Sequence, residues 1–394
     1  MLLTYFRFFF LLLALAPLAY YCLAIFAGFL HLRARRKRSS DRSFAPPVSI
    51  LKPVRGVDPE AYENFASMCD LDYPEYEIVF AVADRDDPVI ALIGKLRAAF
   101  PQRPIRLISG IQQLGKSRKT NSLRRLAKEA YYELLVMNDS DVRVEKDYLW
   151  DVVAPFKDPQ VGVVTALFRS KTNGGVASQI DAVGVPTDTS ANALLAHTFG
   201  RLDFALGWTM AITKTRLAEI GGFEALMDMH SDDFALGNEV AKRGYRIALM
   251  SKPVWMVFPR ESLWEFLVHE LRWSIQLRNL RLAGYAAMFF TFGLAWSLLV
   301  AVFAPSWKLA ACYFAAYAAL RLAVAWVIGA WYLGDPTVKR RPWLVFFRDA
   351  LNLAVYVTSF FSNRVRWRGV SYHLRGPFLE PIIPASNTTP VRQV

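Results

Sequence analysis

The chain has 394 residues, with 47 Lys and Arg against 34 Asp and Glu, which gives a net charge of +13 at neutral pH. Hydrophobic residues make up 54% of the sequence and charged residues 21%, less than the roughly 25% of an average soluble domain. The apolar content excludes a disordered chain, and three cysteines are too few for a disulfide scaffold or a zinc cluster. The length allows two or three domains.

Residues 8–30 form the first of two long uncharged runs, and residues 282–304 form the second. Each run has 23 residues, enough for a helix of about 35 Å against a hydrocarbon core of about 30 Å. Residues 309–333 are a third candidate, interrupted only by Arg321. A buried core helix is the alternative, but these runs are long for one. We therefore expect a membrane protein.

The charges beside the first run predict its orientation. Arg7 alone precedes it, and it is followed by Arg33, Arg35, Arg36, Lys37, Arg38 and Arg42. By the positive-inside rule the chain after Leu30 stays in the cytoplasm. A cleaved signal peptide is the alternative, but the apolar stretch is too long and its basic flank follows rather than precedes it. Residues 1–43 are predicted to be an uncleaved anchor with a basic juxtamembrane segment, and the bacterial inner membrane is the expected location.

The second and third runs predict a transmembrane hairpin over residues 282–334, with a short outer turn at 305–308. Region 335–394 then contains a basic loop, a further apolar stretch at 343–361 and a tail. That stretch holds Arg348 and Asp349 and is followed by Arg364, Arg366, Arg368 and Arg375. Positive charge on both of its sides favours an interfacial or re-entrant helix over a fourth crossing.

Residues 44–260 are polar and read as one α/β domain. Strands are predicted at 48–52, 77–83, 105–109, 133–137 and 161–166, and helices near 88–99, 118–130 and 145–156. This alternation predicts a mostly parallel sheet with helices on both faces. Ligands of such sheets bind beyond the carboxyl ends of the strands, so acidic residues that directly follow strands are candidates for a site.

Two acidic clusters follow predicted strands. Asp84 begins the cluster after strand 77–83, and Asp139 and Asp141 follow strand 133–137. Two carboxylates one residue apart suit Mg²⁺ or Mn²⁺ held together with substrate phosphates. The alternative is an Asx turn that caps the next helix. The position after a buried strand favours the metal site.

A third cluster, Asp232 and Asp233, precedes a helical pattern over 235–243. One acid is explained as a helix cap, but the second is not, and Asp233 is a candidate general base.

Residues 261–281 predict a helix with an apolar face and a polar stripe that includes His269, Arg272 and Gln276. Because this helix directly precedes an apolar run, we expect it to lie at the membrane surface. A solvated charged face is the usual explanation of such a stripe. Arg272 can also grip phosphate with two donors.

Over residues 46–275 these motifs resemble the ceramide glucosyltransferase family, which has the GT-A fold of glycosyltransferase family 21 and includes bacterial hopanoid-associated enzymes. The stretches that carry the resemblance are LKPVRGVDP at 51–59, LDYP at 71–74, DRDDP at 84–88, KTN at 119–121, DSDVRV at 139–144, DDF at 232–234 and RW at 272–273. It implies a Rossmann-like GT-A domain between a transmembrane anchor and C-terminal membrane helices.

The resemblance also implies roles for single residues. Asp84 would lie near the uracil and ribose of a UDP-sugar, with Lys119 and Asn121 facing the nucleotide. Asp139 and Asp141 would hold Mg²⁺ or Mn²⁺ and the diphosphate.

On the acceptor side, Asp233 would be the base. Arg272 and Trp273 belong to the motif that binds the donor. His269 stands where the family usually has Gln or Arg, which leaves its role open.

The implied activity is inverting transfer of one sugar, glucose or N-acetylglucosamine, from a UDP-sugar to a hydroxyl of a membrane lipid, either ceramide-type or a hopanoid polyol. The acceptor pocket is expected in region 190–210, with His197, Trp208 and Thr209 as candidates. A processive polysaccharide synthase is the alternative enzyme, although it normally has more spanning helices. A membrane receptor or anionic-ligand-binding protein is the non-enzymatic alternative. No nucleic-acid partner is expected, because much of the basic excess lies beside apolar segments.

Overall fold

The computed structural model describes residues 2–37, 42–172, 174–200, 202–367 and 370–382. Arg38, Arg368 and the last part of the predicted tail, residues 383–394, lie outside the described residues. The central feature is a seven-stranded sheet. In spatial order its strands are β3 (Ile105–Ser109), β2 (Tyr76–Val82), β1 (Val48–Val54), β4 (Leu134–Met137), β8 (Met210–Thr213), β6 (Val161–Thr165) and β9 (Arg246–Leu249).

The first four of these strands run parallel, with Val48 on β1 opposite Tyr76 on β2 and Leu134 on β4. Strand β8 runs antiparallel to both β4 and β6, and β9 returns parallel to β6. Every residue of β2 and β4 is buried, as expected for strands covered on both faces. The predicted α/β fold with a mostly parallel sheet is confirmed, and the five predicted strands are all present.

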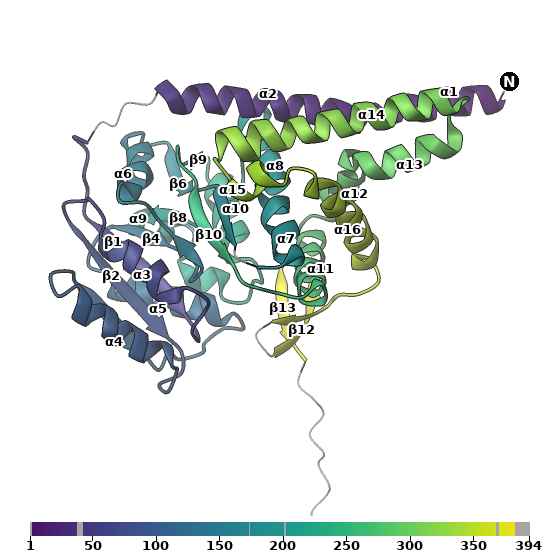
Figure 1. Cartoon of the computed structure of the whole chain (residues 1–394). Coiled ribbons are helices and arrows are strands. Elements are labelled where there is room, and N and C mark those ends of the chain that lie inside the picture. Colours follow the sequence, from purple (N-terminus) through teal and green to yellow (C-terminus); the bar gives the residue numbers. More distant parts are fainter. Residues whose placement is uncertain (1, 38–41, 173, 201, 368–369, 383–394) are drawn as a thin grey trace, which may run out of the picture.

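Helices cover both faces of this sheet (Figure 1). Ile50 and Ile78 point toward one face, whose helices are α3 (Ala61–Cys69), α4 (Val89–Ala99) and α6 (Tyr148–Val153), which continues into η1 (Ala154–Lys157). Leu51 and Val79 point toward the other, whose helices are α5 (Arg118–Glu129), α9 (Lys214–Glu219), η2 (Phe223–Leu226) and α10 (Asp232–Lys242). The alternation of neighbouring residues builds one hydrophobic core on each face.

Two smaller sheets flank the central one. The first consists of β5 (Val142–Arg143), β10 (Val254–Phe258) and β7 (Phe168–Thr172). The second consists of β11 (Arg364–Trp367), β12 (Val370–Arg375) and β13 (Phe378–Pro381), in the region predicted as a tail. The backbone N–H of His230 donates to the carbonyl of Pro377 at 3.0 Å, and Leu379 donates to Asp228 at 2.9 Å. These bonds fix the C-terminal sheet against the segment that leads into α10.

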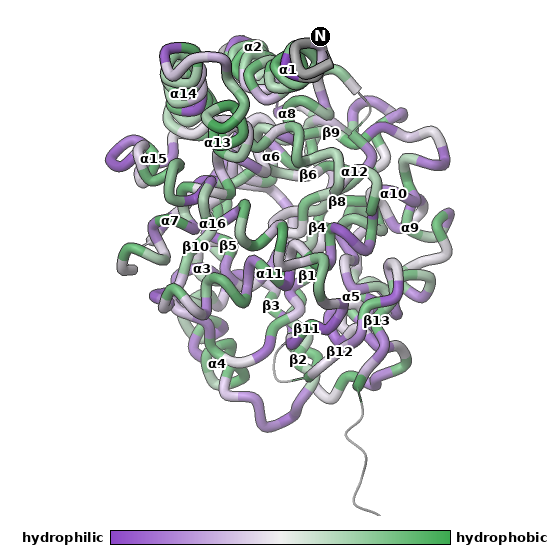
Figure 2. The backbone as a smooth tube through the Cα atoms, turned by 90° about the vertical axis from the view of Figure 1, so that its right-hand side faces the viewer, coloured by the Kyte–Doolittle hydropathy of each residue, from purple (hydrophilic) through white to green (hydrophobic). Residues whose placement is uncertain are grey.

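The apolar helices gather on one side of the molecule (Figure 2). They are α1 (Leu2–Leu13), α2 (Ala16–Lys37), α12 (Leu282–Ala287), η3 (Met288–Thr291), α13 (Gly293–Phe303), α14 (Trp307–Val324), the π-helical η4 (Ala325–Tyr332) and α16 (Leu344–Ser359). Joining them to the α/β domain are α7 (Val176–Thr187), α8 (Thr189–Phe199), α11 (Leu263–Leu280) and α15 (Pro336–Arg340). Helix α2 packs along α14, η4 and α8.

Among the described residues, two helical stretches are long and apolar enough to cross a membrane: Arg7–Arg35, with 29 residues, and Trp307–Tyr332, with 26. The second predicted run differs from a straight span. Its two helices, Leu282–Thr291 and Gly293–Phe303, meet at a bend of 60°. Phe292 leaves the helical conformation at this bend, with φ −83° and ψ 84°.

Gly293 explains how the bend is held in place. A Cβ at this position would lie 2.4 Å from the Tyr317 ring and 2.8 Å from the Tyr21 ring, so only glycine allows this approach. Its N–H also donates to the Tyr21 hydroxyl at 3.3 Å. Close packing against α2 and α14 therefore fixes an interruption that an uncharged run does not predict. The interfacial placement of residues 343–361 stays a prediction; their helix α16 packs on α11 and α7.

Candidate active site

A cavity of about 960 Å³, the chamber from here on, opens beyond the carboxyl ends of β1 and β4 and extends to the apolar helices. Its polar end is lined by Asp58, Lys119, Asp139, Asp141, Asp233 and Arg272. Its largely apolar end is lined by Tyr285, Met288, Phe292, Leu294, Val324 and Tyr356. Trp273 lines the chamber as well. Six of the eight predicted site residues therefore face one cavity.

The first predicted carboxylate pair lies directly after β4. Lys52 Nζ donates to the Asp139 carbonyl at 2.5 Å, and the Ser140 hydroxyl donates to the Asp58 carboxylate. Burial and the nearby charges of Asp139 and Asp58 raise the pKa of Asp141 to about 7. Burial lowers the pKa of Lys52 to about 8. The charges of Asp58 and Asp139 therefore act on Asp141, and its raised pKa reduces the negative charge at this point of the chamber.

Within the described ranges no three His, Cys, Asp or Glu side chains are grouped so that they could hold a metal ion by themselves. Mg²⁺, however, is ordinarily held by one or two carboxylates together with substrate phosphates and water. Asp139 and Asp141 fit such a site. Asp141 Oδ1 is buried and has no hydrogen-bond partner among the described residues, so it is an acceptor available to a cation.

Lys119, at the start of α5, joins the second acidic cluster to the third. Its Nζ lies 2.8 Å from Asp139 Oδ1 and 3.2 Å from Asp232 Oδ2. Burial alone would lower the pKa of Lys119, but the neighbouring carboxylates, Asp139 foremost, raise it above its usual value. Ser117 caps the helix that presents this lysine, because its side chain accepts from the N–H of Thr120 at 3.3 Å.

Asp233 lies in the first turn of α10 and is held by two backbone donors. Gly207 N–H donates to its Oδ2 at 3.1 Å and Phe234 N–H to its Oδ1 at 2.8 Å. Burial and the charge of Asp232 raise the pKa of Asp233 to about 6. A Cβ on Gly207 would lie 3.2 Å from Asp233 Oδ2 and 3.3 Å from Asp139 Oδ2. The second and third acidic clusters therefore flank one glycine.

Helix α11 brings the polar stripe to the chamber. Ser262 and Glu265 form a capping box at its start. The His269 ring packs against Trp273 at 4.4 Å between centroids, and burial, with Arg272 nearby, lowers the pKa of His269 to about 3. This histidine is therefore neutral at physiological pH. The Arg272 guanidinium lies 5.8 Å from the centre of the Trp367 ring on the C-terminal sheet.

Two predicted site residues do not face the chamber. Asp84 is exposed on the loop after β2, where its neighbour Ala83 is the lining residue. Asn121 is buried; its Oδ1 accepts from the N–H groups of Leu114 and Gly115 at 2.8 and 3.0 Å. Asn121 therefore shapes the loop that precedes α5, and it contacts the site only through that loop.

Of the three residues expected in the acceptor pocket, the structure brings one to the chamber. Trp208 lines the chamber, whereas Thr209 is buried and accepts from Asn138 Nδ2 at 2.8 Å. His197 is exposed on α8 and packs edge to face against His31 at 5.0 Å. Neither of the latter two lines the chamber.

Sequence reasoning missed two groups of chamber residues. Asp58 follows β1, so the rule that led to Asp139 applies to it too. Asp188, between α7 and α8, was missed because its partners Arg321 and Asp349 are distant in the chain. The signal in the sequence that could have pointed to this cluster was the presence of Arg321 and Asp349 inside apolar stretches.

Comparison with known proteins places the chain in a family. The family profile described as Glycosyl transferase family 21 matches residues 11–377. Ceramide glucosyltransferase 3 of Caenorhabditis elegans is 27% identical over 249 residues, which cover 62% of this chain and 53% of that protein. Poly-beta-1,6-N-acetyl-D-glucosamine synthase of Staphylococcus aureus is 22% identical over 214 residues, covering 54% of this chain and 50% of that protein.

The match covers about half the length of the first curated relatives, 53% and 50%. Among solved structures, the mannosyltransferase PcManGT from Pyrobaculum calidifontis, in complex with GDP-Man and Mn²⁺, has a TM-score of 0.54 at 20% identity. The similarity covers 89% of this chain and 99% of that one, which supports the GT-A fold. The predicted family is confirmed: the chain belongs to glycosyltransferase family 21.

Proposed function

We propose that this enzyme transfers a single sugar from a UDP-sugar to a hydroxyl of a membrane lipid, with inversion at the anomeric carbon. One observation carries the proposal: a single chamber joins a charged donor end to an acceptor end built from the apolar helices. A nucleoside diphosphate needs the first environment and a lipid needs the second. Both substrates therefore meet beside Asp233.

At the donor end the chain supplies both negative and positive groups. Asp139 and Asp141 would hold the divalent cation, Mg²⁺ or Mn²⁺, which when bound neutralises charge on the departing diphosphate. Arg272 lines the same end and can bind phosphate with two parallel donors. Lys119 is positioned to balance the carboxylates and, with the diphosphate present, to face it.

Asp233, at the same polar end of the chamber, would take the proton from the lipid hydroxyl. The backbone N–H groups of Gly207 and Phe234 fix its carboxylate. With a pKa of about 6 it is ionised at neutral pH yet basic enough to accept a proton. Asp232 is committed to Lys119, which leaves one carboxylate for base chemistry and supports direct displacement with inversion.

The bent pair of helices gives the lipid a route into the chamber. Phe292, at the bend, and its neighbours Thr291 and Leu294 line the acceptor end. Arg35, at the basic end of the first span, donates to the carbonyl of Tyr332, the last residue of the second, at 2.6 Å. The positive-inside rule then puts the α/β domain in the cytoplasm, and the bacterial inner membrane stays our prediction.

Ceramide-type lipids and hopanoid polyols are both compatible acceptors, and UDP-glucose and UDP-N-acetylglucosamine are both compatible donors. A processive synthase is the second candidate, and its support is the similarity to the Staphylococcus aureus polysaccharide synthase. Two or three candidate spans among the described residues favour the lipid enzyme, because a polymer channel normally needs more.

The test uses the full chain in lipid nanodiscs, with radiolabelled UDP-glucose or UDP-N-acetylglucosamine and either ceramide or a hopanoid polyol. We expect one labelled glycolipid, its loss on addition of EDTA, and loss of about 10²–10⁴-fold in kcat for Asp233→Asn. Asp70→Asn is the matched control, since Asp70 is exposed and its ion pair with the exposed Lys146 lies at the surface. Polymer as the product would favour the synthase, and transfer unaffected by EDTA would remove the metal.

A further inference from the structure

We propose that a network centred on Asp188 binds the polar head of the acceptor lipid and selects a head that is uncharged or cationic and donates hydrogen bonds, against an anionic one. The network consists of Asp181, Asp188, Glu270, Arg321, Arg348, Asp349 and Asn352. The inference rests on the proposed function, because every member of the network except the buried Asp181 lines the same chamber. It goes further by assigning a chemical class of lipid head to named residues.

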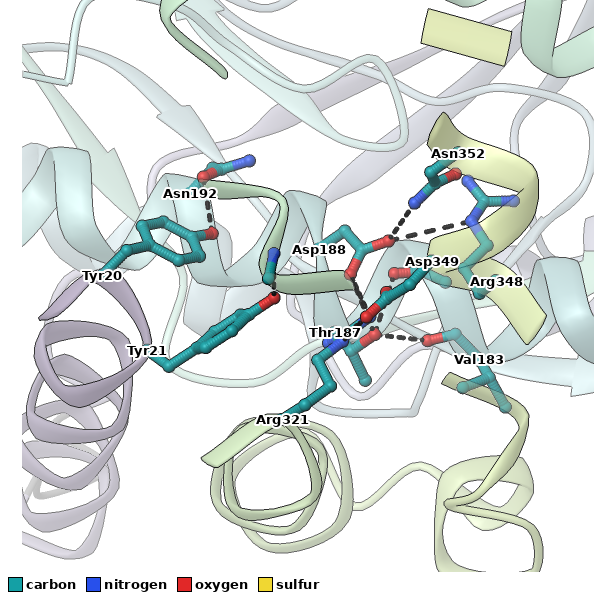
Figure 3. A network of polar contacts seen from close by, with 12 residues as sticks. Tyr20, Tyr21, Val183, Thr187, Asp188, Asn192, Arg321, Arg348, Asp349 and Asn352 are labelled. Atoms are coloured by element: carbon teal, nitrogen blue, oxygen red, sulfur yellow. Dashed lines mark hydrogen bonds and ion pairs between the residues drawn. The ribbon is translucent and has the colours of Figure 1, made fainter. Parts of the chain in front are cut away.

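Arg321 is the anchor of the network (Figure 3). It comes from α14, within the candidate span Trp307–Tyr332. Its Nη2 donates to Asp188 Oδ1 at 2.6 Å and to Asp349 Oδ1 at 2.8 Å, and its Nε donates to both Asp349 oxygens at 3.0 Å. The Arg321 side chain is only 2% exposed, so these carboxylates, and not solvent, balance its charge.

Asp188 is the group that the network presents to the chamber. Its side chain is 28% exposed although it accepts from Arg321, and Asn352 Nδ2 donates to its Oδ2 at 2.9 Å. The backbone places it where α7 ends and α8 begins, and Figure 3 shows it between the arginines of α14 and α16. The carboxylate is therefore fixed in position and still accessible to a ligand.

Arg348 links Asp188 to two further acids. It donates to Glu270 Oε2 at 2.5 Å and to Asp181 Oδ1 at 3.4 Å, and its Nε lies 3.7 Å from Asp188 Oδ2. Glu270 lines the chamber and is 6% exposed. Its Oε1 has no hydrogen-bond partner among the described residues. A buried acceptor without a partner is costly unless a ligand supplies the donor.

The charges of the network do not balance. Four carboxylates, those of Asp181, Asp188, Glu270 and Asp349, face two guanidinium groups, and each guanidinium is paired with more than one of them. Burial and the charge of Glu270 raise the pKa of Asp181 well above its usual range, and burial also raises the pKa of Asp349 against the opposing charge of Arg321, so protonation offsets part of the excess. The remaining charge repels a phosphate head and attracts O–H and N–H donors.

A purely structural role explains this arrangement poorly. Buried ion pairs generally stabilise no better than apolar packing of the same volume, and ionisable residues in membrane segments are retained mainly for function. A structural brace would need neither the excess of carboxylates nor the unsatisfied oxygen of Glu270. A hydroxylated head explains both, because its O–H groups can donate to Asp188 and to Glu270 Oε1.

The test measures equilibrium binding of two tritiated probes to the full chain in detergent: N-hexanoylsphingosine, which is neutral, and its 1-phosphate, which is anionic. We expect the wild type to prefer the neutral lipid by at least about tenfold, roughly the value of one charged hydrogen bond. In Asp188→Asn the neutral lipid should bind about tenfold more weakly and the preference should shrink. UDP affinity, measured in parallel, should not change.

A second variant, Asn352→Ala, removes one hydrogen bond to Asp188 and is the substitute if Asp188→Asn no longer binds UDP. Asp70→Asn is the surface control. Unchanged lipid binding in both variants, equal binding of the two lipids to the wild type, or no binding of the neutral lipid would each overturn the inference. Failure of the proposed function is distinguishable, because the wild type would then either bind no UDP or form polymer instead of a glycolipid in the transfer assay.

Discussion

At the scale of single residues, the chemistry depends on how Asp233 is ionised. Burial, with Asp232 beside it, raises its pKa to about 6 against a usual value of 3.8. Lys119 opposes this shift, and Asp139 adds to it. The unfolded chain releases its proton near pH 4, so the penalty for burying the ionised form is complete above about pH 6 and absent below about pH 4.

The first prediction follows from this pH dependence of the cost of burying ionised Asp233. Asp233→Asn cannot ionise, so its melting temperature relative to that of the wild type should be higher at pH 8 than at pH 4.5. The measurement is thermal unfolding in detergent without added metal. A constant difference between the two proteins at both pH values would show that the carboxylate is not under strain.

Activity should follow the same ionisation. With Asp233 as the base, kcat of the wild type should fall as the pH drops through about 6, because the protonated carboxyl cannot accept the hydroxyl proton. The measurement is the pH profile of glycolipid formation at saturating donor. A flat profile down to pH 5 would contradict the assignment.

Gly207 offers a steric test of the convergence of the two acidic clusters. In Gly207→Ala the new Cβ would lie 3.2 Å from Asp233 Oδ2 and 3.3 Å from Asp139 Oδ2, so the carboxylates must move apart. The shift needed at each carboxylate is a few tenths of an ångström, and because a misplacement of about 1 Å costs about 10²-fold, we expect a smaller loss of up to about tenfold in kcat. Gly94→Ala is the matched control, since nothing lies within 4 Å of its Cβ in helix α4. Equal activity of the two variants would contradict the geometry.

At the scale of elements, the sequence predicts what is local. Strand 105–109 was predicted with its observed ends, and helix 118–130 begins after the cap Ser117. The antiparallel β8 was missed because a short buried strand has no distinctive period. The C-terminal sheet was missed although Val370, Tyr372 and Leu374 alternate. Its partners lie far away in the chain, at residues 228–230.

The candidate site likewise contains residues that local sequence predicts and residues whose placement depends on distant partners. Asp139, Asp141 and Asp233 were predicted from their places after strands or before a helix, and the structure brings them to one chamber. Asn121 was predicted at the site but does not line the chamber, because its amide forms four local hydrogen bonds. The sequence cannot distinguish such an amide from one that faces a ligand. In the sequence, Arg321 was noted only as a charge that interrupts the apolar run 309–333. Its ion pair could not be predicted, because its partner Asp349 comes from another apolar stretch.

The bend at Phe292 is the element with the clearest consequence. In Gly293→Leu the larger side chain would clash with the Tyr317 and Tyr21 rings, already 2.4 and 2.8 Å from a Cβ. Overpacking of this kind costs about 1–3 kcal/mol, and we expect a lower melting temperature and weaker lipid binding with unchanged UDP affinity. Loss of UDP binding with intact lipid binding would contradict the assignment of the two ends.

At the scale of the whole molecule, the basic ends of the spans predict which side of the membrane holds the α/β domain. In a chain with its three cysteines replaced, Lys308→Cys at the start of α14 should react with an impermeant maleimide in intact spheroplasts. Arg340→Cys, after η4, should react only after lysis. Labelling of Lys308→Cys only after lysis would show that the bent pair is re-entrant and that the predicted hairpin does not cross.

The central claim is that one chamber brings a nucleotide-sugar and a membrane lipid together beside Asp233. Mass spectrometry of total lipids from cells that express the wild type or Asp233→Asn tests this claim most directly. The account predicts, for the wild type only, a lipid heavier than its precursor by one hexose or one N-acetylhexosamine residue. Identical lipid profiles, or a polysaccharide in place of the glycolipid, would contradict it.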